Sequence, residues 1–235
     1  MNDFFKRTEC LIGKSSLLKL NNSHVAVFGL GGVGSYAVEA LARSGVGSLT
    51  FIDNDCYEST NINRQLYATT KTLGRKKTEV CKERVLDINP DINVTTIDKF
   101  ILQNDSEIDF TKFDYVIDAI DTISGKLEII KQCKKHNVPF ISCMGTGNKL
   151  DPTAFKVADI KNTKVCPLCK VMRKLLKENN IENVKVIFSE EQPITSNLKD
   201  NFDANPNSIT PSSISFVPSV AGLIASGEAI KYIIK

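Results

Sequence analysis

Short apolar runs alternate with segments of helical periodicity over the first 145 residues of this chain. The apolar runs are rich in Val and Ile and are bounded by Gly, Asn, Asp or Pro, a pattern typical of buried strands. The predicted strands are 25–28, 49–53, 92–97, 114–120 and 138–143, and the predicted helices are 33–44, 76–88 and 125–136. Strands separated by helices of this length predict an α/β fold with a mainly parallel, Rossmann-like sheet and helices on both faces.

The pattern changes after Gly147. Residues 153–160 and 184–189 are expected to be strands of a second, partly antiparallel layer that extends this fold, with a helix at 166–179 between them. Residues 196–213 are rich in Asn, Ser, Asp and Pro, which predicts a mobile loop, and an apolar helix follows from about Ser219.

We therefore expect one domain over residues 1–235 rather than two. Its parts are an N-terminal helical arm at 1–23, a core at 24–147 and a C-terminal part at 148–235. A chain of this length is sufficient to bury a sizeable core.

The amino-acid composition says little about the cellular location of the protein or about its binding partners. The net charge is +3, which is too small to indicate a polyanionic partner by itself. The chain starts without an apolar signal segment, and its most apolar late stretch, 221–235, contains Glu228 and Lys231. We expect no membrane span. Seven scattered cysteines then indicate reduced thiols in a cytoplasmic protein.

A glycine motif, GLGGVG at Gly29–Gly34, lies between the first predicted strand and the first predicted helix. Its glycines are Gly29, Gly31, Gly32 and Gly34. Such a turn lets backbone approach a phosphate and directs a helix N-terminus at it. Asp53 ends the next strand, where a carboxylate can bind ribose hydroxyls. These features predict nucleotide binding but do not distinguish NAD from ATP.

The segments downstream favour ATP. They are DND at 53–55, TNINRQ at 60–65, GRKKTE at 74–79 and DAID at 118–121. Arg64 and Lys77 supply two cations, and Asp121 follows the fourth strand as an oxygen ligand suited to Mg²⁺. A triphosphate undergoing cleavage needs such groups, because charge develops on the departing phosphates. Taken singly, Asp53 and Asp118 could be ordinary strand-end carboxylates, with Arg64 paired to one of them.

In this order the motifs resemble the adenylating fold of ubiquitin-activating enzymes and their bacterial sulfur-carrier relatives. The resemblance implies that Gly32, Asp53, Asn61, Arg64 and Lys77 hold ATP, and that Asp121 holds Mg²⁺. It also implies that Arg7 reaches into the site of a partner subunit, with Arg64, Lys77, Asp121 and Arg7 as the catalytic set. The candidate nucleotide site comprises Gly29, Gly31, Gly32, Gly34, Asp53, Asp55, Asn61, Arg64, Gln65, Lys77, Asp118, Asp121 and Thr122.

Within that superfamily the chain is most similar to the tRNA threonylcarbamoyladenosine dehydratases. The similarity is carried by RTECLIG, VAVFGLGGVGSYAVEALARSGVG, TNINRQLYA, KTEVCKERVLDINP, MGTGNKLDPT and SISFVPSVAGLIASGEAI, among other segments. It implies ATP-dependent cyclisation of threonylcarbamoyladenosine beside the tRNA anticodon, through an acyl-adenylate. It further implies a homodimer and an association with cysteine desulfurase or sulfur-acceptor proteins.

Three alternatives are less favoured by the sequence. The first is adenylation of the C-terminal glycine of a ubiquitin-like sulfur carrier, whose enzymes commonly carry two C-x₂-C pairs. The second is an NAD-dependent oxidoreductase, which TNINRQ and DAID oppose. The third is a non-catalytic nucleotide-sensing module.

The single C-x₂-C pair, Cys166 and Cys169, opens the predicted helix at 166–179. Tetrahedral zinc needs four ligands and the chain has no second pair, so we expect no bound zinc. The simplest interpretation is a helix start whose core-facing residues are Cys169, Met172, Leu175 and Leu176. A redox or sulfur-relay role has no further support in the sequence.

The same helix carries the strongest local charge. Lys170, Arg173, Lys174 and Lys177 recur at helical spacing and predict one basic stripe. Such a stripe suits tRNA phosphates, although a solvated face explains it equally well. The family resemblance favours tRNA.

Overall fold

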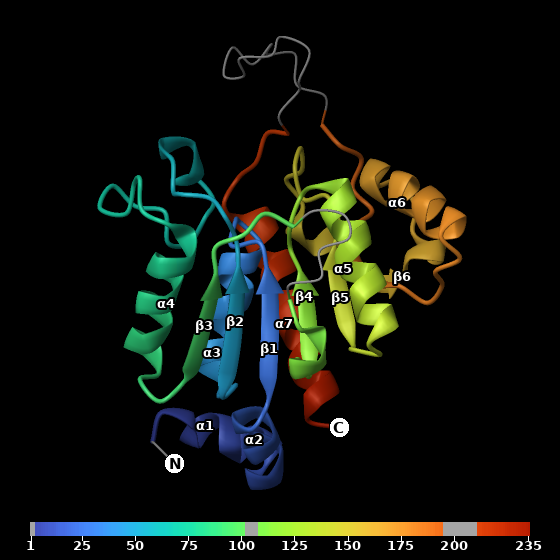
Figure 1. Cartoon of the computed structure of the whole chain (residues 1–235). Helices are drawn as coiled ribbons and strands as arrows, with labels where there is room; N and C mark the ends of the chain where they lie inside the picture. The colour runs from blue at the N-terminus through green and yellow to red at the C-terminus, as the bar shows by residue number, and fades with distance from the viewer. Residues whose placement is uncertain (1–2, 102–107, 195–210) are drawn as a thin grey trace.

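Seven strands form one sheet through the centre of the molecule (Figure 1). In this computed structural model, residues 3–101, 108–194 and 211–235 are described. The strand order is β3-β2-β1-β4-β5-β7-β6, and every neighbouring pair is parallel except β6 with β7. The strands are β1 (His24–Phe28), β2 (Ser48–Ile52), β3 (Asn93–Ile97), β4 (Tyr115–Asp118), β5 (Phe140–Cys143), β6 (Phe155–Asp159) and β7 (Lys185–Ser189).

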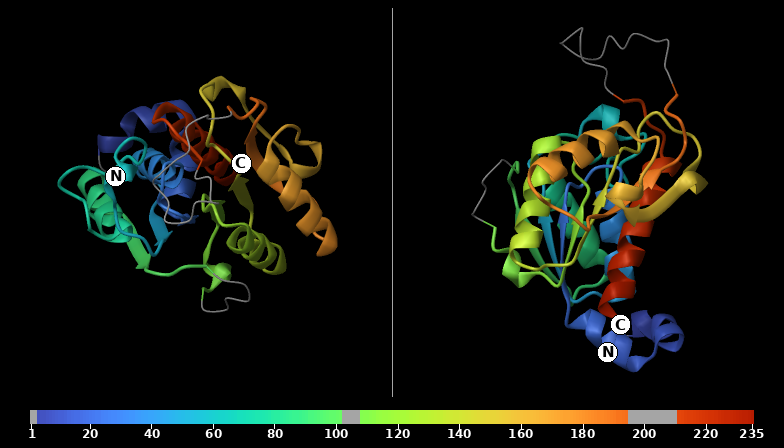
Figure 2. Two further views of the ribbon diagram at one scale, coloured as in Figure 1. Left: turned by 90° about the horizontal axis from the view of Figure 1, so that it is seen from above. Right: turned by 90° about the vertical axis from the view of Figure 1, so that its right-hand side faces the viewer.

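Helices cover both faces of this sheet (Figure 2). The longer ones are α1 (Lys6–Ile12), α2 (Lys14–Asn21), α3 (Gly34–Ser44), α4 (Lys77–Ile88), α5 (Ile123–Lys135), α6 (Pro167–Glu178) and α7 (Phe216–Ile233). Short 3₁₀ helices are η1 (Asp3–Phe5), η2 (Ser59–Asn61), η3 (Phe110–Lys112), η4 (Pro152–Ala154) and η5 (Ile160–Asn162). One buried apolar cluster joins the sheet to α3, α4 and α7, and a second joins it to α5 and α6. The predicted Rossmann-like architecture is confirmed.

The C-terminal part differs from the prediction in one respect. The strands at 153–160 and 184–189 do not build a second layer, because β7 pairs in parallel with β5 and β6 adds an antiparallel edge to the same sheet. The last helix also begins earlier, at Phe216 rather than Ser219, with Pro218 in its first turn. Proline is tolerated there because first-turn N–H groups have no partner within the helix.

The N-terminal arm lies at the end of the sheet where the strands begin, opposite their carboxyl ends (Figure 1). Helix α2 contacts α7, and the Lys19 ammonium donates to the Ile234 carbonyl at 3.3 Å. Most of the predicted mobile loop at 196–213 lies outside the described residues. In the described parts of the chain, no helix is both long and apolar enough to cross a membrane.

Candidate nucleotide-binding and active site

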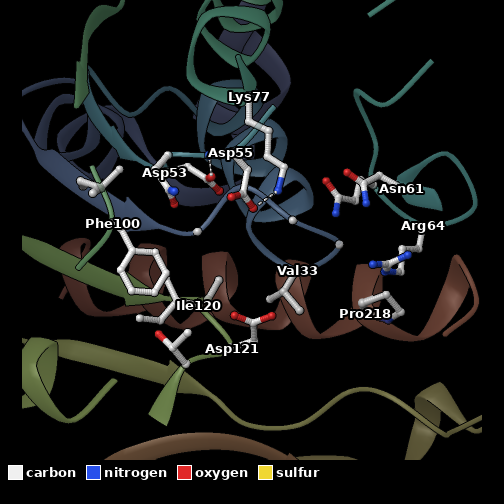
Figure 3. Close-up of a pocket in the computed structure, with 18 of the residues that line it drawn as sticks. Val33, Asp53, Asp55, Asn61, Arg64, Lys77, Phe100, Ile120, Asp121 and Pro218 are labelled. Atoms are coloured by element: carbon white, nitrogen blue, oxygen red, sulfur yellow. Dashed lines mark hydrogen bonds and ion pairs between the residues drawn. The ribbon is translucent and has the colours of Figure 1, made fainter. Parts of the chain in front are cut away.

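A cavity of about 410 Å³ opens at the carboxyl ends of the central strands (Figure 3). It lies where β1 and β4 are neighbours while their connections leave toward opposite sides, which is where open α/β sheets bind ligands. Among the predicted nucleotide ligands, those lining it are Gly29, Gly31, Gly32, Asp53, Asp55, Asn61, Arg64, Gln65, Lys77, Asp121 and Thr122. Gly34 and Asp118 do not line it.

The glycine loop leaves β1 in a conformation that excludes side chains at two positions. Gly29 has φ +85°, and a Cβ there would lie 2.8 Å from the Ala119 carbonyl oxygen. A Cβ on Gly34 would lie 1.7 Å from the Gly29 oxygen. Gly34 thus allows α3 to begin directly after the loop, whose Gly31, Gly32 and Val33 line the cavity.

Asp53 connects the glycine loop to the segment after β2. Its Oδ2 accepts a hydrogen bond from the Leu30 N–H at 2.6 Å, and its Oδ1 accepts one from the Asp55 N–H at 2.8 Å. Burial raises the pKa of Asp53, while the Lys77 charge and these two hydrogen bonds act in the opposite direction. The carboxylate therefore holds two loops at the cavity wall.

Lys77, at the start of α4, carries a buried ammonium group at the cavity. The residue is 5% exposed, and its Nζ lies 2.8 Å from Asp55 Oδ2. The isolated bridge of Cys56 with Lys76 brings this helix start against the DND segment. The carboxylate that pairs with the lysine charge faces solvent, because the Asp55 side chain is 58% exposed.

Residues of the TNINRQ segment form the side of the cavity next to Lys77. Asn61 accepts a hydrogen bond from the Glu58 N–H on its Oδ1 at 3.1 Å, which fixes the 3₁₀ turn η2. Arg64 donates to the Thr60 carbonyl at 2.8 Å and to Asn63 Oδ1 at 2.9 Å. The buried Gln65 Oε1 finds no partner among the described residues. Because buried acceptors are generally hydrogen-bonded, we expect a ligand or a water molecule to donate to this oxygen.

Asp121 faces the cavity from the side opposite Asp53 and Asp55 (Figure 3). It follows β4 by three residues and lines the cavity with Thr122, the residue before α5. Within the described residues, no group of three or more His, Cys, Asp or Glu side chains forms a protein-only metal site. A single carboxylate still fits Mg²⁺, which commonly binds one or two carboxylates together with phosphates and water.

Asp118 has a different position from the one predicted. It is fully buried below the cavity, where both its oxygens lie 3.1 Å from the Lys126 Nζ and it accepts a hydrogen bond from the Ser142 hydroxyl. Lys126 also donates to the Cys143 carbonyl at 2.6 Å. The last residue of β4 faces α5, so its charge is used inside the protein and is not presented to the cavity.

Arg7 and the basic stripe lie away from the cavity. Arg7 is exposed on α1, at the other end of the sheet, so it does not reach the cavity of its own chain (Figure 1). On α6, Lys170, Lys174 and Lys177 are exposed, whereas Arg173 is half-buried and donates to the Thr163 carbonyl at 3.0 Å. The stripe thus consists of three lysines, and Arg173 anchors the helix to the segment before it.

An apolar wall of the cavity was not predicted. Phe100 and Ile120 lie beside each other there, with Ile52 and Ile101 also lining the cavity (Figure 3). Phe100 is 45% exposed, although it is a large aromatic residue. Phe100 follows β3 by three residues. That position could have indicated a place at the cavity, because residues that follow parallel strands meet at one edge of the sheet.

Comparison with known proteins shows the family of this chain. Residues 5–235 match the ThiF family. A tRNA threonylcarbamoyladenosine dehydratase of Bacillus subtilis is 46% identical over 240 residues, which covers 98% of this chain and 94% of the relative. The sulfur carrier protein ThiS adenylyltransferase of Escherichia coli is 34% identical but matches only 56% of this chain and 53% of its own length.

Solved structures show the same likeness in three dimensions. The E. coli tRNA N6-threonylcarbamoyladenosine dehydratase TcdA superposes with a TM-score of 0.87 in its complex with ATP and 0.88 in its complex with AMP. The two are 32% and 33% identical to this chain, and each comparison covers 97% of this chain and 93% of the other. The chain belongs to the ThiF family, in the branch of the tRNA threonylcarbamoyladenosine dehydratases.

Proposed function

We propose that this protein dehydrates threonylcarbamoyladenosine in tRNA, beside the anticodon, in an ATP-dependent reaction that adenylates the threonyl carboxylate. One observation carries the proposal. A single cavity at the switch point of the sheet is lined by a glycine loop, Arg64, Lys77 and Asp121. Relatives that match nearly the whole chain bear this activity in their names, and the relative named for sulfur-carrier adenylation matches little more than half.

This reaction requires the protein to position the substrate carboxylate and to neutralise the phosphate charges, and it does not require a nucleophilic side chain. A carboxylate is a poor acyl donor because its leaving group would be oxide, and attack on the α-phosphate of ATP converts it to a mixed anhydride. Arg64 and Lys77 would neutralise the phosphates as negative charge shifts to pyrophosphate. Asp121 would hold Mg²⁺, which supplies further neutralisation of the phosphate charge when bound.

The second step needs little help from side chains. The nucleophile that closes the ring belongs to the same substrate molecule as the activated carboxyl group, so its effective concentration is already high. The products are AMP, pyrophosphate and a substrate that has lost one water.

The cavity also suits the nucleoside part of ATP. Phe100 and Ile120 offer an apolar wall for the adenine ring, and Gln65 Oε1 offers an acceptor for a ligand donor. The glycine loop and the start of α3 would then receive the phosphates.

We extend the proposal to the assembly on the basis of the family resemblance. Arg7 lies at the other end of the sheet from the cavity of its own chain, so we propose that it enters the site of a second copy within a homodimer. We take residues 1–235 as one adenylating domain whose nucleotide-binding core is 24–147. Cytoplasmic location and cysteine desulfurase or sulfur-acceptor partners remain parts of the same proposal, drawn from the family.

One experiment tests the function. The protein is incubated with ATP, Mg²⁺ and tRNA carrying threonylcarbamoyladenosine, and the nucleosides are then weighed after digestion. Loss of one water from the modified nucleoside with formation of AMP is the expected result. An unchanged nucleoside mass, together with pyrophosphate exchange driven by a small carrier protein, would replace this proposal by sulfur-carrier adenylation.

A further inference from the structure

Cys166 and Cys169 form a buried pair at the start of α6, outside the nucleotide cavity. Cys166 is the N-cap residue, Pro167 is the first residue of the helix, and Cys169 lies in its first turn. The two residues are 3% and 0% exposed. Residues three apart at a helix start face the same side, which brings their sulfurs within reach of each other.

An unusual turn precedes the pair. Val165 has φ +67°, which is rare for a β-branched residue. The Cys166 N–H donates to the Lys164 carbonyl at 2.7 Å, so the backbone closes a γ-turn of the strained, positive-φ kind. Val165 itself is 40% exposed. The turn that leads into Cys166 is thus exposed at both Lys164 and Val165.

The two sulfurs differ in their electrostatic surroundings. The Cys169 thiol, and then the backbone amides of Cys169, Gly145 and Leu168, stabilise the Cys166 thiolate and lower its pKa to about 6. The interaction with Cys166 and burial raise the pKa of Cys169. A thiolate beside a protonated thiol is the arrangement of redox-active C-x₂-C pairs, in which the N-terminal sulfur attacks first.

The other buried cysteines serve as a contrast within the same chain. Burial raises the pKa of Cys81 and of Cys133, and it raises that of Cys143 to about 12. All three thiols lie in the buried apolar clusters, so they remain protonated at neutral pH. Burial alone therefore does not explain the state of Cys166, because the Cys169 thiol and the neighbouring backbone amides lower its pKa.

We propose that Cys166 and Cys169 are a redox-active dithiol that a hydroperoxide oxidises to an intramolecular disulfide. The Cys166 thiolate attacks the peroxide and breaks its O–O bond, giving a sulfenic acid and hydroxide. The Cys169 sulfur then attacks the Cys166 sulfur and displaces the hydroxyl group, which takes the Cys169 proton and leaves as water. In total, two thiols and one hydrogen peroxide give one disulfide and two waters. A dithiol reductant reverses the reaction.

Mass spectrometry of the intact enzyme's cysteines tests this. Reduced protein is treated with a small excess of hydrogen peroxide, quenched with catalase, and alkylated with N-ethylmaleimide. Trypsin then releases residues 165–170 as one peptide that holds both cysteines. We expect this peptide to become lighter by two hydrogen atoms and to resist alkylation, and dithiothreitol to restore both alkylation sites. Cys10, which is exposed, is the internal comparator.

Two variants separate the roles of the sulfurs. In Cys169→Ser, Cys166 should stop at the sulfenic acid and be trapped by dimedone, and in Cys166→Ser, Cys169 should not react. In wild-type protein, alkylation of Cys166 should persist down to about pH 6. A peptide 165–170 that stays doubly alkylated after Cys10 is oxidised would overturn the proposal, as would a Cys166 whose alkylation is already lost well above pH 6. These readouts do not depend on tRNA or ATP, so they are independent of the proposed activity.

Discussion

The ammonium group of Lys77 lies 2.8 Å from Oδ2 of Asp55, and the two side chains differ tenfold in exposure, at 6% and 58%. The lysine is thus held at the wall of the cavity by a partner that water can also solvate. An ion pair with one solvated partner is weak, because the carboxylate is already well hydrated. The entry of a triphosphate would allow Lys77 to exchange this carboxylate for phosphate without moving far.

Replacing Lys77 should therefore impair catalysis more than folding. For Lys77→Met we expect the rate of AMP formation to fall about 100- to 1,000-fold, the usual cost of removing one group that stabilises developing charge. Lys76→Gln is the matched control, because the side chain of this neighbour is 38% exposed and pairs with Asp98 at 3.0 Å. Equal rates for Lys77→Met and Lys76→Gln in single-turnover assays would remove Lys77 from the catalytic set.

The buried pair of Asp118 and Lys126 should contribute to stability in a strongly coupled way. Lys126→Met leaves the Asp118 carboxylate in the interior without its cation, which should lower the free energy of unfolding by about 3–5 kcal/mol. The double variant Asp118→Asn/Lys126→Met should lose much less than the sum of the two single variants. Lys135→Met, an exposed change on the same helix, serves as the control in urea titrations. Additive losses would show that the two charges act separately.

Phe100 should contribute to affinity for ATP through its ring. Stacking of a base on an aromatic side chain is worth about 1–3 kcal/mol, so Phe100→Ala should weaken ATP binding by about 5- to 150-fold. Phe100→Tyr should retain most of the affinity. Tyr232→Ala alters an exposed aromatic residue near the end of α7 that does not line the cavity, and it should leave ATP binding unchanged, as measured by isothermal titration calorimetry.

Glu39 on α3 should give a pH-dependent contribution to stability. Burial acts to raise its pKa, but hydrogen bonds from Arg84, Arg43 and Tyr67 outweigh burial and lower the pKa below the ordinary glutamate value. A lowered pKa in the folded state means that the stabilisation is present above the unfolded-state pKa and is lost as pH falls through the folded-state value. The difference in free energy of unfolding between wild type and Glu39→Gln should therefore be largest at neutral pH and should disappear in acid. Glu83→Gln, at an exposed pair with Arg75, should show a much smaller difference in the same denaturation series.

The order of strands and helices could be predicted from the sequence because apolar periodicity and turn residues are local signals. The glycine loop and Asp53 were predictable for the same reason, since they lie next to the strands that position them. Asp118 and Asp121 show the limit of such reasoning. Asp118 ends β4 and Asp121 follows it by three residues. The partner of the buried Asp118 is a lysine on the following helix, and that contact depends on how α5 packs.

The unpredicted features share this dependence on packing. Phe100 lies outside any motif, and only the arrangement of β3 beside β2 brings the segment after it to the cavity. Arg173 has the spacing of a stripe residue, yet its side chain turns back to the Thr163 carbonyl. Sequence spacing gives the face of a helix, whereas the direction of a long side chain follows from its neighbours.

The three exposed lysines of the α6 stripe provide the test of tRNA binding, and Arg173 is left out of it because its contacts are structural. Changing Lys170, Lys174 and Lys177 to Gln should weaken tRNA binding and reduce the slope of its salt dependence by about 2–3, one for each lost phosphate contact. Affinity for ATP should stay unchanged, because none of the three lines the cavity. The matched control replaces three exposed lysines elsewhere, Lys14, Lys71 and Lys82, by Gln. If both triple variants lose the same affinity and the same slope in filter-binding titrations, the effect is one of net charge and the stripe is a solvated face. A loss confined to the α6 variant assigns this helix to the tRNA, because equal changes in charge then differ only in position.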